Sequence, residues 1–316
     1  MTDTPIRHFL TVDDLQPEEL LAVLDLADDL KAERPTPASR ASSTWGDVLH
    51  GKSVALIFEK PSTRTRVSFE VGVRELGGHP VVLTGQQLQL GRGETVADTA
   101  RVLSRYVHAI VLRTFGQDRL EDLAEAGDIP IINALSDLTH PCQAVADLQT
   151  IREYKGTLAG LKLTYLGDGN NMAHSLLKAG AMTGMHVVIG HPEGYAPNGQ
   201  IVDEARTLAE FSGGAITVTT DPETACVDAD VLYTDVWASM GQESESTERA
   251  ALFRPYQLNS GAMALARPDA IVMHCLPAHR GEEISAQAID GDASVVFSQA
   301  ENRLHAQKAL LITLLT

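Results

Sequence analysis

Residues 58–70 read FEKPSTRTRVSFE and join a predicted strand to a predicted helix. The overlapping run SVALIFE, at 53–59, is apolar and β-branched enough for a buried strand, and Pro61 ends it. Ser62 is a favourable N-cap residue, and apolar residues recur at helical spacing after it. The sequence therefore predicts a buried strand, a tight connection and a helix that begins near Thr63.

The first turn of that helix has the properties of an anion site. Its backbone N–H groups have no partner within the helix and lie at the positive end of the helix dipole, so a phosphate gains hydrogen bonds and charge stabilisation together. Ser62, Thr63 and Thr65 add hydroxyl donors. Arg64 adds a planar fork of N–H groups, whereas Arg66 lies on another helix face and is expected to pair with an acidic side chain. The alternative is an ordinary capped helix with a solvated basic end.

The rest of the chain carries further motifs. They are QLG at 89–91, RTFG at 113–116, HPCQ at 140–143, DGNNM at 168–172, DVWASMG at 235–241, HCLP at 274–277 and ENR at 301–303. Together with STRTR at 62–66, they resemble the aspartate/ornithine carbamoyltransferase family, in the family's order and essentially from end to end. STRTR and HPxQ are shared across the family, whereas SMG and HCLP resemble its ornithine-specific branch.

The resemblance implies transfer of the carbamoyl group of carbamoyl phosphate to the side-chain amine of L-ornithine, giving L-citrulline and phosphate, with no metal and no organic cofactor. This reaction serves arginine biosynthesis and also arginine breakdown. The catalytic residues are then expected to be Arg113, His140, Asp235, Cys275 and Arg303. Carbamoyl phosphate is expected to contact Ser62, Thr63, Arg64, Thr65, Gln89, Arg113, His140, Gln143, Cys275, Leu276 and Arg303. Ornithine is expected to contact Asn171, Asp235, Ser239 and Met240.

Carbamoyl transfer sets three chemical requirements, which are to hold phosphate, to stabilise a negative oxygen and to present a neutral amine. Residues 62–65 form the phosphate cradle, and Arg113 is a second fork. His140, Arg113 and Thr65 can donate toward the oxygen, and removing one such donor costs about 10² to 10³ in rate. Gln143 can accept from the carbamoyl NH₂, which distinguishes a carbamoyl from an acetyl group.

The amine requirement follows from its basicity, since an alkylammonium has a pKa of about 10.4. Crowding by three arginines and closure of the site would both favour the neutral amine. The arginines are Arg303, Arg113 and Arg64. By the resemblance, Asp235 meets the α-amino group of ornithine, while Cys275 and the Leu276 carbonyl meet the side-chain amine.

Two other interpretations of HCLPAH are open. Cys275 could be a covalent nucleophile, but adjacent residues on a strand face opposite ways, so His274 is a poor base for it. A metal site of His274, Cys275 and His279 has irregular spacing.

Two polar segments complete the expected ornithine site. Residues 238–250 are polar and poor in large apolar side chains, so they are predicted to form a mobile loop that brings Ser239 and Met240 over the substrate. Asn171 suits the substrate carboxylate, and Asn170 is expected to fix the turn.

Gln89 lies in a glycine-bordered stretch, TGQQLQLGRGE, which is typical of a surface loop. In the family the equivalent glutamine reaches carbamoyl phosphate from a neighbouring subunit. The resemblance therefore implies a homotrimer with shared active sites.

Composition limits the partners. A formal net charge of −17 opposes binding to nucleic acid or to an anionic membrane, since both require a basic surface. Cys142, Cys226 and Cys275 are too few and too scattered for a disulfide framework, which indicates a reducing cytoplasm. No export signal is found, and no run approaches the about 18 apolar residues of a membrane span.

Strand-like runs alternate with helical patterns, which is typical of α/β folds with parallel sheets covered on both faces. With 316 residues, two doubly wound parallel-sheet domains are expected. The first spans 1–147 and, by resemblance, is joined by the C-terminal helix at 301–316; it would bind carbamoyl phosphate. The second, 148–300, would bind ornithine. Because ligands bind beyond the carboxyl ends of parallel strands, the active site is predicted in the cleft between the domains.

The predicted elements are nine strands and eight helices. The strands are at 53–59, 79–83, 108–112, 129–132, 161–166, 186–190, 215–219, 230–234 and 270–273. The helices are at 14–31, 63–76, 94–105, 117–126, 141–154, 171–183, 201–212 and 301–314.

Alternatives remain at three levels. Within the family, the acceptor could be acetylornithine, putrescine or aspartate, although Asp235 with the SMG loop favours an amino acid with a free α-amino group. LGDGNNM resembles a dinucleotide fingerprint and would indicate an NAD-dependent oxidoreductase, but Met172 occupies the third glycine position. A non-catalytic phosphometabolite-binding protein is the third alternative.

Overall fold

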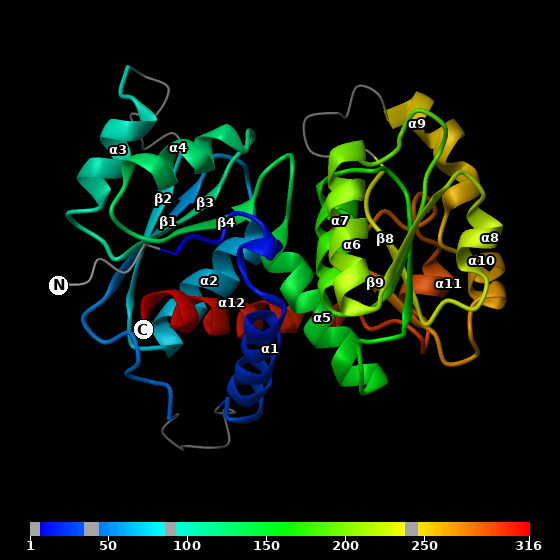
Figure 1. Ribbon diagram of the computed structural model, residues 1–316, viewed down its shortest axis with the longest axis horizontal. Helices are drawn as coiled ribbons and strands as arrows, with labels where there is room; N and C mark the ends of the chain where they lie inside the picture. Colours follow the sequence, from blue (N-terminus) through cyan, green and yellow to red (C-terminus); the bar gives the residue numbers. More distant parts are fainter. Residues whose placement is uncertain (1–6, 35–43, 86–92, 238–245) are drawn as a thin grey trace. The chain divides into compact units, whose positions relative to one another are not determined.

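The computed structural model describes residues 7–34, 44–85, 93–237 and 246–316 (Figure 1). The chain divides into two compact units, of which the first consists of Met1–Gln149 and Glu301–Thr316 and the second of Thr150–Ala300. Each unit is built around its own parallel sheet. The predicted fold class, two parallel-sheet α/β domains, is therefore confirmed.

The first sheet has four parallel strands in the order β2-β1-β3-β4. The strands are β1 (Ser53–Phe58), β2 (His79–Thr84), β3 (Ala109–Arg113) and β4 (Ile131–Leu135). β1 and β3 are buried along almost their whole length, as expected for strands covered on both faces. β1 lies between β2 and β3, so the strand order reverses there, and ligand-binding loops are expected beyond its carboxyl end.

Helices cover both faces of the first sheet (Figure 1). On one face, Leu120 packs with Ile57 and Ile110 in a core cluster under α3 and α4. On the other, α2 packs closely against α12, because a Cβ at Gly72 would lie 3.2 Å from Lys308 Cγ. The helices are α1 (Pro17–Ala32), α2 (Thr63–Glu75), α3 (Val96–Leu103), α4 (Asp118–Ala126), α5 (Pro141–Lys155) and α12 (Val296–Leu315), with a short 3-10 helix at Val12–Asp14.

The second sheet has five parallel strands in the order β7-β6-β5-β8-β9. In Figure 1, α6 and α7 lie on one side of this sheet and α8, α10 and α11 on the other, where Leu232 and Val272 share a core cluster with Ile284. The strands are β5 (Lys162–Leu166), β6 (His186–Gly190), β7 (Ala215–Thr219), β8 (Val231–Thr234) and β9 (Ile271–His274). The helices are α6 (Asn171–Met182), α7 (Gly199–Ser212), α8 (Pro222–Cys226), α9 (Ser246–Phe253), α10 (Ser260–Leu265) and α11 (Ala286–Ile289), with a 3-10 helix at Arg254–Tyr256.

The described residues contain all nine predicted strands, and two expectations for helices are wrong. The final helix begins at Val296 rather than at 301. Gln299 anchors this added turn, because its side chain accepts from the His274 N–H at 2.9 Å and donates to the Tyr233 hydroxyl at 3.0 Å. Residues 238–250 are not wholly a loop, since α9 begins at Ser246, where the run ERAALF is rich in helix-forming residues.

Within the part of the chain that the structure describes, no helix combines the length and the apolar composition needed to cross a membrane.

Helix α12 buries a histidine among positive charges. His305 is fully buried. Burial, aided by the cations Lys308, Arg34 and Lys31 and opposed by Glu75, lowers the pKa of His305 to about 4. The imidazole is therefore neutral in the folded chain at neutral pH.

This histidine is expected to make folding sensitive to acid. In the unfolded chain its pKa returns to about 6.5, so the unfolded state takes up a proton before the folded state does. Its contribution to stability is full above pH 6.5 and is lost toward pH 4, by up to about 3 kcal/mol in the free energy of unfolding. Urea denaturation at about pH 7 and about pH 5 measures the free energy of unfolding at both pH values. This free energy should fall less between the two pH values in His305→Gln than in the parent chain. His50→Gln, at an exposed turn, is the control, and equal slopes for both variants would contradict the prediction.

Candidate active site

The connection after β1 forms the predicted strand–turn–helix. Helix α2 begins at Thr63, as predicted, and Ser62 occupies the N-cap position with an extended backbone. The Ser62 side chain makes no capping hydrogen bond, so it does not use up an N–H group of the first turn. Arg66 lies 3.8 Å from Glu70, which confirms that it pairs with an acidic side chain.

Arg64, Arg113, His140 and Arg303 come together in the first unit as a basic cluster. Arg113 ends β3, His140 precedes α5, and Arg303 lies on α12; these three are almost fully buried. Burial lowers the pKa of His140 well below its usual range, and the nearby Arg303, Arg113 and Arg64 lower it further. The imidazole is thus neutral, able to donate or accept a hydrogen bond within a positive environment.

Arg303 also joins three elements of the first unit. Its Nη1 donates to Gln143 Oε1 at 2.8 Å, and its Nη2 donates to Thr65 Oγ1 at 2.8 Å. Gln143 Nε2 in turn donates to Asp147 at 2.8 Å. Because Thr65 Oγ1 accepts from Arg303, its own proton is not directed at Arg303, and Gln143 Oε1 has a second lone pair besides the one that accepts from Arg303. The sequence did not predict this link, since Arg303 is far from both partners along the chain.

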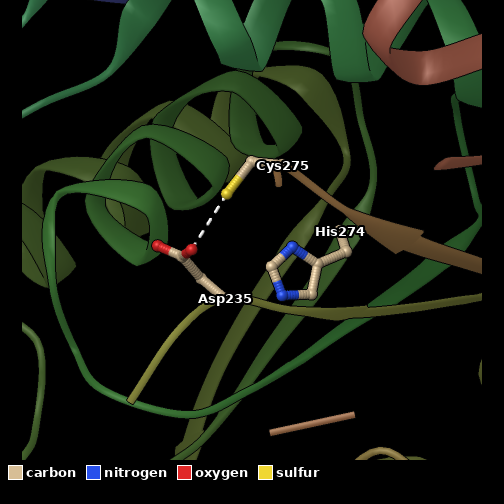
Figure 2. Close-up of side chains that lie close together, drawn as sticks. All are labelled: Asp235, His274 and Cys275. Carbon is tan, nitrogen blue, oxygen red and sulfur yellow. Dashed lines mark hydrogen bonds between the residues drawn. The ribbon is translucent and has the colours of Figure 1, made fainter. Parts of the chain in front are cut away.

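In the second unit, Asp235 and Cys275 lie side by side. They follow β8 and β9, which are neighbours with Thr234 opposite His274. Cys275 Sγ donates to Asp235 Oδ1 at 3.0 Å, and Figure 2 shows the sulfur pointing toward that carboxylate. Asp235 Oδ1 also accepts from the Val236 N–H at 2.8 Å. Asp235 is only 8% exposed, so its charge lies in a largely water-excluded setting.

His274 holds the turn that carries Cys275. Its Nδ1 accepts from the Leu276 N–H at 2.9 Å, so its Nε2 carries the proton and donates to Glu283 Oε1 at 3.0 Å. Leu276 has a φ of +58°, a left-handed backbone that strains a non-glycine residue. The hydrogen bond to His274 stabilises this conformation and fixes where the Leu276 carbonyl points.

These contacts bear on the two other interpretations of HCLPAH. The thiol of Cys275 is bonded to Asp235, and both nitrogens of His274 are engaged elsewhere, so His274 is not arranged as a base for Cys275. Ligand atoms of Asp235, His274 and Cys275 lie within 4.8 Å of one another, but His274 has no ring lone pair left for a metal. His279 groups instead with Glu282 and Glu283 in the described part of the chain.

The DGNNM turn follows β5. Asn170 caps α6, accepting from the Met172 and Ala173 N–H groups, which confirms its predicted role at the turn. Asn171 is the first residue of α6 and is partly exposed. Three further predicted residues lie outside the described residues, namely Gln89, Ser239 and Met240.

The chain matches two domain families along almost its whole length. Residues 7–153 match the carbamoyl-P binding domain of aspartate/ornithine carbamoyltransferases, and residues 159–314 match their Asp/Orn binding domain. The chain therefore belongs to the aspartate/ornithine carbamoyltransferase family.

The individual proteins that it resembles are ornithine carbamoyltransferases. The ornithine carbamoyltransferase of Parafrankia sp. is 61% identical over 98% of this chain and 96% of its own length. That of Rhodococcus opacus is 56% identical over 99% of this chain and 97% of its own. The solved ornithine carbamoyltransferase from Pyrococcus furiosus has a TM-score of 0.90 at 52% identity, covering 96% of both chains. The predictions of a carbamoyltransferase and of resemblance to the ornithine-specific members are confirmed.

Proposed function

We propose that the chain transfers the carbamoyl group of carbamoyl phosphate to the side-chain amine of L-ornithine, giving L-citrulline and phosphate. One observation carries the proposal: a neutral, buried His140 lies among three guanidinium groups, one of them in the first turn of α2. Such a site suits a phosphate next to a carbonyl that becomes negative during reaction. The similarity to ornithine carbamoyltransferases over almost the full length supports the same substrates.

The proposed phosphate site is the first turn of α2. Its backbone N–H groups and the hydroxyls of Ser62, Thr63 and Thr65 donate to phosphate oxygens, as does the fork of Arg64. Arg113 approaches from the end of β3 as a second fork. The charge on phosphate grows as the bond to the carbonyl carbon breaks, so these donors bind the leaving group more strongly in the transition state.

The proposed oxyanion donors are His140, Arg113 and Thr65. A neutral imidazole with one N–H suits this task, and the Thr65 proton is not used toward Arg303. Gln143 is proposed to accept from the carbamoyl NH₂ through its second lone pair. Cys275, Leu276 and Arg303 complete the proposed contacts to carbamoyl phosphate.

The amine of ornithine must lose a proton before it attacks. Its nitrogen then forms a bond to the carbonyl carbon, the bond from that carbon to the phosphate oxygen breaks, and the departing phosphate takes up the second amine proton. The positive charge of the basic cluster favours the neutral amine by repulsion. Cys275 and the Leu276 carbonyl are proposed to orient it, and Asp235 to bind the α-amino group.

The remaining contacts and the larger arrangement are also proposals. Asn171 is proposed to bind the ornithine carboxylate, and Ser239 and Met240 to contact the same substrate. We assign residues 1–147 with 301–316 to carbamoyl phosphate and 148–300 to ornithine.

We also propose a cytoplasmic homotrimer in which Gln89 reaches carbamoyl phosphate in a neighbouring subunit. Sedimentation of the active enzyme tests the assembly, because a fully active monomer would exclude shared sites.

Citrulline formation by the purified protein, supplied with both substrates, tests the function. Acetylornithine, putrescine and aspartate should each be carbamoylated much more slowly than ornithine, since none has ornithine's free amino-acid end together with its side-chain amine. Faster turnover of one of these amines would reassign the acceptor, and the absence of turnover with every amine would refute the proposal.

A further inference from the structure

The carboxyl edge of the second sheet carries two acidic residues from adjacent strands. β5 pairs with β8, with Leu166 opposite Thr234, so the segments that follow them leave the sheet together. Asp168 lies just beyond Leu166, and Asp235 follows Thr234 directly. Asp235 is 8% exposed and the Asp168 side chain 16%, and Asp235 raises the pKa of Asp168 in addition to the larger effect of burial.

Arg249 of α9 binds one of the two carboxylates. Its Nη1 donates to Asp168 Oδ2 at 2.7 Å and to the Trp237 carbonyl at 2.8 Å. The guanidinium also lies 5.0 Å from the ring centre of Tyr195 and 5.9 Å from that of Phe253. Arg249 is only 7% exposed, so its charge acts in a water-poor setting and opposes the rise in the pKa of Asp168.

Asp235 has a different set of partners. Its hydrogen bonds within the described residues come from the Val236 N–H, the Cys275 thiol and, at 3.4 Å, Asn170 Nδ2. All three donors are uncharged. The two carboxylates therefore differ in their partners, because a guanidinium binds Asp168 whereas only uncharged donors contact Asp235.

We propose that Arg249 is a specificity-determining positioning residue, which neutralises Asp168 so that the cationic α-amino group of ornithine pairs with Asp235 alone. The inference rests on the proposed function of the site. Without Arg249, the ammonium would meet two carboxylates and settle in positions that misalign the side-chain amine. Without Asp168, the released guanidinium would compete with the ammonium for Asp235.

Each single substitution therefore has its own kinetic effect. Asp168→Asn should raise the ornithine KM about ten-fold or more, because a fixed cation blocks Asp235. Arg249→Met should instead lower kcat by about ten-fold, with no rise in the ornithine KM, because ornithine binds but in the wrong position. The KM for carbamoyl phosphate should stay unchanged in both variants.

The double variant Asp168→Asn/Arg249→Met separates this charge effect from a merely structural role. It removes both charges, so ornithine kinetics should return to within about three-fold of the parent enzyme. Arg249→Lys, which keeps a cation beside Asp168, should also stay near the parent values.

Binding of L-norvaline, which has the α-amino group but no side-chain amine, gives a second measurement. Its affinity for the enzyme loaded with carbamoyl phosphate should fall in Asp168→Asn and recover in the double variant. A double variant no better than the worse single variant would overturn the inference, as would normal ornithine kinetics in both single variants. Parent enzyme that makes no citrulline would instead refute the proposed function.

If the substitutions at Asp168 prevent folding, comparing Arg249→Met with Arg249→Lys still tests whether the positive charge at this position matters. Equal ornithine kinetics in these two variants would overturn the inference, because the cation would then have no effect on how ornithine binds.

Discussion

Arg64→Met is expected to lower kcat/KM for carbamoyl phosphate by about 10² to 10³. The side chain lies in the first turn of α2 and is close enough to His140 to lower its pKa. It thus adds positive charge both to the proposed phosphate site and to the proposed oxyanion site. Methionine keeps much of the apolar stem but removes the guanidinium, so the loss should fall on the transition state more than on stability.

Arg66→Met is the matched control on the same helix. Arg66 is exposed and lies 3.8 Å from Glu70, so its removal costs a surface ion pair worth at most about 1 kcal/mol. Its kcat/KM for carbamoyl phosphate should stay within about two-fold of the parent value. The kcat/KM of Arg64→Lys should lie between those of Arg64→Met and Arg66→Met, because lysine restores a positive charge but not the planar fork of N–H groups. Steady-state kinetics with carbamoyl phosphate varied measures all three, and similar losses at both arginines would reject the assignment of Arg64.

How far the sequence could predict this site depends on the kind of contact. The start of α2 was predictable because it depends on neighbours along the chain, with Pro61 ending a strand and Ser62 suited to the N-cap position. The pairing of Arg66 with Glu70 was predictable for the same reason, since residues four apart share a helix face.

Contacts that depend on tertiary packing were not predictable. Arg303 binds Thr65 and Gln143, and no rule of spacing brings these three together. Likewise, α12 begins at Val296, where Gln299 forms hydrogen bonds with groups on β8 and β9, whereas the sequence predicted a start at 301. The sequence therefore predicted local structure along the chain better than it predicted which distant groups contact the proposed site residues.

The role of His274 was also not predictable from the sequence, and substitutions of His274 are expected to have a large effect on activity with ornithine. From the sequence it could be a base or a metal ligand, but its ring supports the backbone instead. Burial raises the pKa of Glu283, yet hydrogen bonds from His274 and from the His279 N–H outweigh burial, and the pKa lies below its usual value. An ionised carboxylate only accepts, so it fixes the imidazole with its proton on Nε2 and its lone pair toward the Leu276 N–H.

His274→Gln and His274→Asn should therefore differ although both remove the ring. The Asn amide reaches the position of Nδ1 and can still accept from the Leu276 N–H, whereas the Gln amide reaches toward Glu283 and leaves that N–H without its acceptor. A buried N–H without a partner costs about 1 to 3 kcal/mol, enough for Leu276 to leave its left-handed conformation. The Leu276 carbonyl and Cys275 would then move away from the ornithine amine.

His274→Gln is expected to lower kcat/KM for ornithine by about 10- to 100-fold, and His274→Asn by less than about ten-fold. The KM for carbamoyl phosphate should rise less than the ornithine KM, because the proposed phosphate donors Arg64 and Arg113 lie in the other unit and only the contacts of Cys275 and Leu276 are displaced. Glu283→Gln should also lower kcat/KM for ornithine, but by less than His274→Gln. A neutral amide can donate as well as accept, so it no longer fixes the imidazole proton on Nε2. Kinetics with ornithine varied, run alongside thermal unfolding, separates this effect from lost stability. Equal losses in the Asn and Gln variants at matched stability would mean that His274 acts through something other than the Leu276 N–H.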